Sequence, residues 1–220
     1  MLKSLKPILQ LVYPPNCLIC LAPGSSFCFG CNSNWLTDTK IGQINRIPLY
    51  FTNYYNADNA KIILAAKENG NKVAKQLLAN SIFTSLTKAK LDLNLIGEIA
   101  LVSIPSSLTS IRKRGRNHIN DLVNQVVGIA MSQEIKLINL PILSITKKIK
   151  DQSNLNKSQR ILNMSNAYLA KSPECAFKNL IIIDDLITTG ASIQEAIRAL
   201  SVINLRPVAI ITACAVGAHL

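Results

Sequence analysis

Two adjacent acids, Asp184 and Asp185, follow a short apolar run and precede a loop of small and hydroxyl-bearing residues. The run over residues 180–183 is typical of a buried parallel strand. In an open α/β sheet, ligands bind beyond the carboxyl ends of the strands. There the acids can accept hydrogen bonds from sugar hydroxyls, while the loop offers N–H groups and hydroxyls to a phosphate at the start of the next helix. This combination suits a phosphorylated ribose, and the loop residues concerned are Thr188, Thr189, Gly190, Ala191 and Ser192.

The same segment resembles the 5-phosphoribosyl-1-diphosphate (PRPP) binding motif of type I phosphoribosyltransferases. That motif is a hydrophobic run, two acids, a hydrophobic residue and a Thr-Thr-Gly loop, and all of it is present. One alternative is an ordinary buried strand that ends in solvated acids. A P-loop ATPase would need G-x-x-x-x-G-K-[ST], which the chain lacks. A haloacid-dehalogenase nucleophile would need Asp-x-Asp, whereas these acids are adjacent.

Four cysteines near the start form two C-x2-C pairs separated by seven residues: Cys17, Cys20, Cys28 and Cys31. Two such turns can bring four thiolates around one tetrahedral Zn²⁺. A Pro-Gly-Ser-Ser turn between the pairs lets them fold back together. We expect a structural zinc site, because a full set of cysteine ligands has no open position for catalysis. A redox site or a remnant of a metal site is the alternative. The remaining pair lies elsewhere: Cys214 is expected to pack in a buried strand, and Cys175 is assigned no role.

The chain has 220 residues, of which 49% are hydrophobic, so a folded α/β domain with a small appendage is expected. No apolar run is long enough for a membrane span. Residues 1–12 have the pattern of an amphipathic helix that packs on the protein rather than of a signal peptide. We therefore expect a cytoplasmic protein, in which disulfides are uncommon.

Positive charge is concentrated in one part of the chain. The net charge is +12, and residues 101–160 carry ten Lys or Arg against three acids. Such a concentration suits a highly anionic ligand, either a diphosphate ester or a nucleic-acid backbone. A basic solvated face is the alternative.

Strand patterns alternate with helical ones, which predicts a doubly wound, mainly parallel sheet. We divide the chain into two parts. Residues 1–48 contain a helix, the four-cysteine unit and a linker over 32–48, and residues 49–220 form the α/β domain. Trp35 and Leu36 are expected to anchor the cysteine unit, and Asp58 and Asn117 to cap helices. Strands are expected at 49–55, 99–104, 135–143 (broken by Pro141), 180–183 and 207–216, and helices at 58–68, about 71–87, from 117, and at 193–200.

Three segments together resemble the competence protein F (ComF) family: the loop after the 99–104 strand, residues 152–163, and the acid loop. That family is phosphoribosyltransferase-like, has a four-cysteine zinc unit at its N-terminus, and is associated with DNA uptake in natural transformation. The resemblance covers residues 14–216. The family motif Arg-x-Arg-Gly-Phe-Asn-Gln lies on residues 112–118, with Arg116 in place of the aromatic residue and His118 in place of Gln. A second motif lies intact on Gln152, Leu155, Arg160 and Asn163, and in the acid loop Ser192 takes the place of a frequent Thr.

The resemblance implies a phosphoribosyltransferase. Asp184 and Asp185 would hold the ribose hydroxyls, and the following loop would hold the 5-phosphate. The loop at Ser106 and Ser107 would receive the diphosphate, with Arg112 and Arg114 as its clamps and Mg²⁺ arriving with the substrate. These two arginines could instead be surface charges, and Arg160 and Asn163 share a helix face for either binding or structure. His118 is interpreted as a helix-start residue rather than an acid or base.

The acceptor of the phosphoribosyl group is not indicated by any motif. A second hypothesis is a non-catalytic competence factor. In it, the zinc unit and the basic stretch would contact single-stranded DNA or a DNA-uptake helicase. Aromatic residues make up only 5% of the chain, which provides few platforms for stacking bases.

Overall fold

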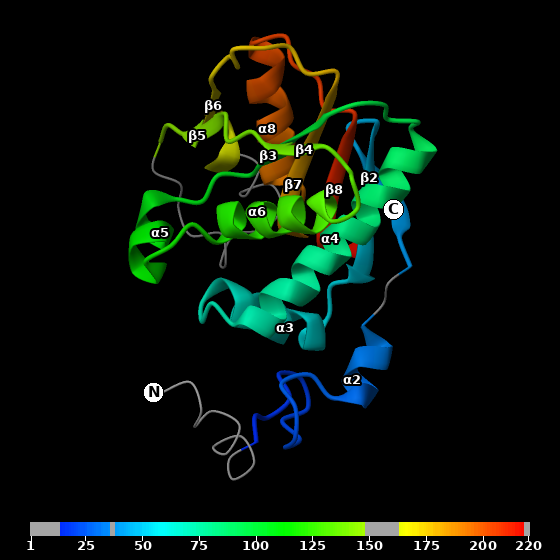
Figure 1. Ribbon diagram of the computed structural model, residues 1–220. Helices are drawn as coiled ribbons and strands as arrows, with labels where there is room; N and C mark the ends of the chain where they lie inside the picture. Colours follow the sequence, from blue (N-terminus) through cyan, green and yellow to red (C-terminus); the bar gives the residue numbers. More distant parts are fainter. Residues whose placement is uncertain (1–13, 36–37, 148–162, 218–220) are drawn as a thin grey trace, which may run out of the picture.

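The computed structural model describes residues 14–35, 38–147 and 163–217 (Figure 1). Its centre is a six-stranded sheet with the order β1-β2-β8-β7-β3-β4. Only the edge pair β1–β2 is antiparallel; every other neighbouring pair in this sheet is parallel. The expected mainly parallel α/β sheet is thereby confirmed. The strands are β1 (Lys40–Ile44), β2 (Ile47–Tyr54), β3 (Ile99–Ser103), β4 (Leu137–Asn139), β7 (Asn179–Ile187) and β8 (Ala209–Ala215).

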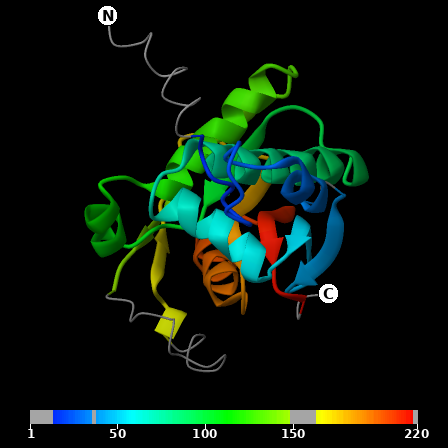
Figure 2. The same cartoon turned by 90° about the horizontal axis from the view of Figure 1, so that it is seen from below.

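Helices cover both faces of the sheet, as the doubly wound pattern requires (Figure 2). One face packs against α3 (Ala57–Lys67), α4 (Lys72–Asp92) and α6 (His118–Met131). The other face packs against α8 (Ala191–Val202). All residues of β3 and β8 are buried, because strands covered on both faces have no solvent side. Two short helices complete the described helices: α2 (Phe29–Asn34) and α5 (Leu108–Arg114).

Three asparagines begin the helices of the first face. The side chains of Asn56, Asn71 and Asn117 each accept a backbone N–H three residues on. The expected cap at Asn117 is confirmed. The expectation that Asp58 caps α3 is wrong, because Asn56 takes that place and Asp58 lies in the first turn.

The expected strand over 135–143 is two strands. Its first part is β4, and beyond Pro141 the chain forms β5 (Leu143–Ile145), which pairs antiparallel with β6 (Tyr168–Ala170) as a separate two-stranded sheet. The linker expected over 32–48 is wrong in part, because the residues from Lys40 form β1 and join the central sheet. Residue 48 lies within β2, and the division into 1–48 and 49–220 stays a prediction.

Three other features complete the comparison with the expectations. The helix expected over residues 1–12, and Leu36, lie outside the described residues. Cys214 is buried in β8, as expected. Within the described ranges, no helix is both long and apolar enough to cross a membrane.

Candidate active site

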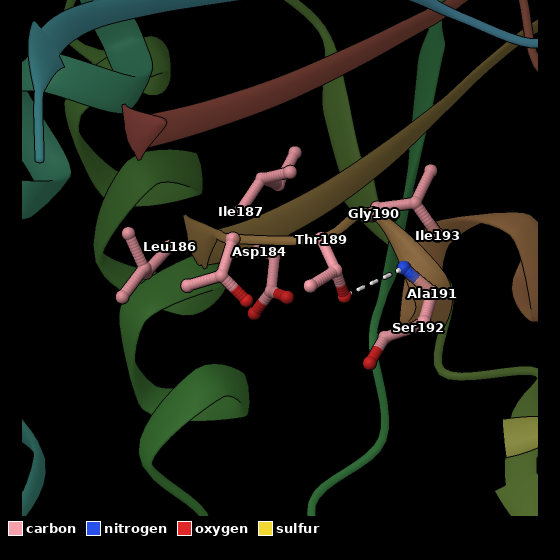
Figure 3. Close-up of a pocket in the computed structure, with 9 residues that line it drawn as sticks. Asp184, Leu186, Ile187, Thr189, Gly190, Ala191, Ser192 and Ile193 are labelled. Carbon is pink, nitrogen blue, oxygen red and sulfur yellow. Dashed lines mark hydrogen bonds between the residues drawn. The ribbon is translucent and has the colours of Figure 1, made fainter. Parts of the chain in front are cut away.

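The acid pair lies at the carboxyl end of β7, in the middle of the sheet. The strand pairs with β8 on one side and β3 on the other, so its end is surrounded by elements that share the same edge. Asp184 turns back on the chain, since its Oδ1 accepts the backbone N–H of Asp185 at 2.9 Å. In Figure 3 the side-chain oxygens of Asp184, Thr189 and Ser192 lie on one side of the loop. These residues line a small pocket that is open to solvent.

The start of α8 can receive an anion. Gly190 precedes the helix with φ of 75°, a left-handed conformation that glycine adopts without steric cost. It has no side chain to cap the first N–H groups of α8, and the Oγ1 of Thr189 accepts only from the Ala191 N–H, at 3.4 Å. Uncapped N–H groups together with the helix dipole favour a phosphate at this position.

Asp185 is held by two basic side chains that come from elements far from it in the sequence. The Nε2 of His118 lies 3.1 Å from its Oδ2, and the Nζ of Lys67 lies 3.7 Å from the same oxygen. Burial alone would raise the pKa of Asp185, but Lys67 and His118 outweigh burial and hold that pKa below its usual range. Burial and the neighbouring Asp185 raise the pKa of Asp184, while the Asp185 carboxylate raises the pKa of Lys67.

Lys67 was not singled out from the sequence. It is the last residue of α3, where a Lys-Glu pair before Asn-Gly indicates only the end of a helix. Its partner Asp185 is more than a hundred residues away in the sequence, and only the strand order brings the two together. His118 does begin α6, as expected, but its buried contact with Asp185 could not be seen in the pattern.

The two arginines expected to clamp a diphosphate lie on α5, which was expected to be a loop. Arg114 forms an ion pair with Glu68. Both Nε and Nη2 of Arg114 lie 3.0 Å from Oε1 of Glu68. Arg112 is exposed, and no described contact links it to the acids. Their role as clamps stays a prediction.

The loop after β3 lies beside the acid strand, because the N–H of Ile104 donates to the carbonyl of Ile183 at 3.0 Å. Ser106 is half-buried in this loop. Ser107 caps α5 by accepting the N–H of Ser110 at 3.1 Å. A structural role for the Ser107 hydroxyl is therefore established, and binding by either serine stays a prediction.

A model of the phosphoribosyl transferase domain matches residues 108–219, about half of the chain. The chain belongs to the phosphoribosyl transferase domain family. The matched segment contains α5, α6 and β7 with its acid loop, while Lys67 and the four cysteines precede it. A comparison with curated proteins gave no match.

Tyr168 also contacts the candidate site of this phosphoribosyl transferase domain, and the sequence did not indicate that contact. Its side chain is hydrogen-bonded to Ser192, and burial together with the nearby Asp184 raises its pKa above the ordinary value. Its backbone is attached to α8: its N–H donates to Glu195 Oε1 at 3.0 Å, and its carbonyl accepts from Arg198 Nη2 at 2.9 Å. The strand β6 thus holds α8, the helix that begins directly after the acid loop.

The intact motif at 152–163 is only partly described. Gln152, Leu155 and Arg160 lie outside the described residues. Asn163 is half-buried where the described chain resumes, before β6. Their contribution to binding stays a prediction.

A second centre precedes the phosphoribosyl transferase domain. The sulfur atoms of Cys17, Cys20, Cys28 and Cys31 all lie within 4.8 Å of one another, so they can hold a tetrahedral metal ion. Burial opposes ionisation of Cys17, but amide hydrogen bonds from Cys28, Cys20 and Ile19 lower the pKa of its thiol to about 6. Amides directed at a sulfur atom favour the thiolate form that binds metal.

The cysteine unit is docked on the helices of the first face. Trp35 is buried and donates its indole N–H to Ser81 of α4 at 3.0 Å, which confirms the expected anchor. Lys61 of α3 donates to the carbonyl of Ile19 at 2.9 Å. The unit therefore contacts the helix whose last residue is Lys67.

Proposed function

We propose that the protein binds PRPP with Mg²⁺ and transfers its 5-phosphoribosyl group to an acceptor, with release of diphosphate. One observation carries this proposal. An acid pair and an uncapped helix start meet at the end of a central strand of a phosphoribosyl transferase domain. This arrangement supports the proposal, because carboxylates can accept hydrogen bonds from sugar hydroxyls and helix-start N–H groups can donate to a phosphate.

Each group has a role in this proposal. The loop from Thr188 to Ser192 binds the 5-phosphate, and Asp184 and Asp185 accept hydrogen bonds from the ribose hydroxyls. Mg²⁺ neutralises charge on the diphosphate and keeps few protein ligands. Arg114 and Lys67 supply positive charge from the side of α5 and α3, and Arg112 remains a further candidate.

The reaction needs no protein nucleophile. The bond from C1 of the ribose to the diphosphate oxygen breaks, and its electron pair leaves with the diphosphate. A lone pair of the acceptor forms the new bond to C1, which carries positive charge in the transition state. Catalysis then consists of positioning together with electrostatic stabilisation of the departing diphosphate.

Calorimetric titration with PRPP and Mg²⁺ tests the proposal. We expect binding by the native protein, and Asp185→Asn to weaken it by about tenfold or more, because hydrogen bonds to a buried charge contribute roughly 1.5–3 kcal/mol. Asp58→Asn is the matched control, since Asp58 is exposed and its ion pair is with Lys61 rather than with the acid loop. No binding at millimolar PRPP, or native binding by Asp185→Asn, would refute the proposal.

We further propose that the cysteine unit holds structural zinc and that the chain acts in DNA uptake in the cytoplasm, as its resemblance to the competence protein F family implies. The donor set supports the metal: four sulfur atoms at one centre leave no position open for catalysis. The ion would then stabilise the unit that docks on α3 and α4.

A second candidate function is contact with single-stranded DNA or with a DNA-uptake partner. One observation favours it: Phe29, between the cysteines of the second pair, is 88% exposed. An exposed aromatic ring can stack on a base. Binding of single-stranded DNA at two salt concentrations tests this, with Phe29→Ala expected to weaken it. No affinity even at low salt would exclude direct contact with DNA.

A further inference from the structure

His118 and Asp185 form a buried contact that the proposed transfer does not by itself require. The two side chains are 2% and 5% exposed, and Nε2 lies 3.1 Å from Oδ2. His118 is the first residue of α6, whose start is held by the Asn117 cap. Both the backbone and the ring of His118 are therefore restrained at this position.

The second ring nitrogen indicates which proton His118 carries. Nδ1 is buried and has no hydrogen-bond partner among the described residues. Nε2 is the ring nitrogen that faces Asp185, and an ionised carboxylate can only accept a hydrogen bond. The ring therefore carries its proton on Nε2, which donates to Asp185.

Lys67 does not replace this restraint. Its Nζ is 3.7 Å from Oδ2, beyond a hydrogen bond, and its side chain is 36% exposed. Lys67 thus contributes positive charge near Asp185, whereas the hydrogen bond from the His118 ring fixes the orientation of the carboxylate. Both basic groups reach Oδ2. The Asp184 side chain is also hydrogen-bonded to Asp185, so a ribose hydroxyl has to share or displace that contact.

We propose that His118 is a positioning residue for ribose recognition. Its Nε2–H holds the Asp185 carboxylate by Oδ2, so that Oδ1 accepts a hydrogen bond from a ribose hydroxyl. This inference rests on the proposed function, in which the acids bind ribose, and adds a residue to which the family resemblance assigned no chemistry. His118 acts through Asp185 and does not itself touch the reacting atoms.

Two probes separate positioning from folding: ribose 5-phosphate, which has hydroxyls, and inorganic phosphate, which has none. We expect His118→Leu to weaken ribose 5-phosphate about tenfold, the effect of one buried hydrogen bond, and to leave inorganic phosphate unchanged. His118→Gln keeps an N–H donor and should recover most of the lost affinity. Equal loss of both probes, unchanged ribose 5-phosphate binding by His118→Leu, or no recovery by His118→Gln would overturn the inference.

Nitrogen-15 NMR of the native protein provides a measurement that does not depend on a variant folding. We expect the His118 ring to carry its proton on Nε2 at neutral pH. A proton on Nδ1 alone would overturn the inference. If the native protein binds inorganic phosphate but not ribose 5-phosphate, the proposed function itself fails. If the native protein binds ribose 5-phosphate and the His118 variants bind it equally well, only the inference about His118 fails.

Discussion

The guanidinium of Arg116 donates from Nη2 to the carbonyl of Lys67 at 2.9 Å and thereby joins the turn before α6 to the end of α3. The same nitrogen donates to the carbonyl of Ala66 at 3.0 Å. The last carbonyls of a helix have no partner within the helix, and a cation there also complements the helix dipole. Lys67 and His118, which both reach Asp185, are thus held by segments that Arg116 connects.

Arg116→Met should lower the free energy of unfolding by about 1–3 kcal/mol, because two carbonyls lose a charged donor. Urea unfolding measures this change. Arg112→Met is the matched control, since Arg112 is exposed, and it should change stability by less than about 0.5 kcal/mol. Equal effects of the two substitutions would contradict a bracing role for Arg116.

Gly70→Ala should disturb the contact between the Arg116 guanidinium and the end of α3, because the added Cβ would lie against the guanidinium. Gly70 has φ of +64°, and a Cβ there would lie 2.7 Å from Nη1 of Arg116. The left-handed conformation costs about 1–2 kcal/mol for a residue with a Cβ, and displacement of the guanidinium adds to it. Gly115→Ala is the control, because Gly115 has φ of +66° with nothing within 4 Å of the added atom.

A double-mutant cycle separates the two costs. In an Arg116→Ala background, Gly70→Ala should cost no more than Gly115→Ala does in the native protein. An extra cost of Gly70→Ala that persists without Arg116 would show that the close approach is not its source.

Removal of metal should destabilise the cysteine unit and the contacts it makes with α3 and α4. We expect about one zinc ion per chain by elemental analysis, and a chelator to lower the melting temperature, because metal binding contributes to folding free energy. Cys20→Ser should act in the same direction, whereas Cys175→Ser, at an exposed cysteine outside the cluster, should not. Native stability of a variant with all four cysteines replaced by serine would rule out the structural role.

The acid loop could be predicted from the sequence because its residues are consecutive, and their order alone indicates a strand end followed by a helix start. The cysteine cluster could be predicted for the same reason, since two short turns define it. The partners of Asp185 could not, because Lys67 and His118 meet it only through the order of parallel strands, which no local pattern specifies. Tyr168 was missed because β6 has three residues, too few for a periodic signal.

The lowered pKa of Asp185 predicts how its contribution to stability depends on pH. A carboxyl whose pKa is lower in the folded state stabilises the protein above its unfolded pKa of about 4, and this contribution is lost as pH falls through the folded pKa. Asp185→Asn should therefore be most destabilising near pH 7, and its difference from the native protein should shrink steadily as pH falls below about 4. Unfolding free energies at several pH values test this, with Asp58→Asn as an exposed control. A difference from the native protein that stays constant with pH would contradict the prediction.

Glu68 competes with a diphosphate for Arg114, because its carboxylate already accepts a hydrogen bond from Nε and forms an ion pair with Nη2 of that arginine. Glu68→Gln should therefore free the guanidinium and tighten binding of diphosphate with Mg²⁺ by up to about fivefold, the range of a partly exposed ion pair. Glu98→Gln makes the same charge change at an exposed site before β3 and should have little effect. Arg114→Gln should weaken diphosphate binding in both the native and the Glu68→Gln backgrounds. If Glu68→Gln tightened binding equally when Arg114 was absent, the gain would come from net charge rather than from release of this arginine.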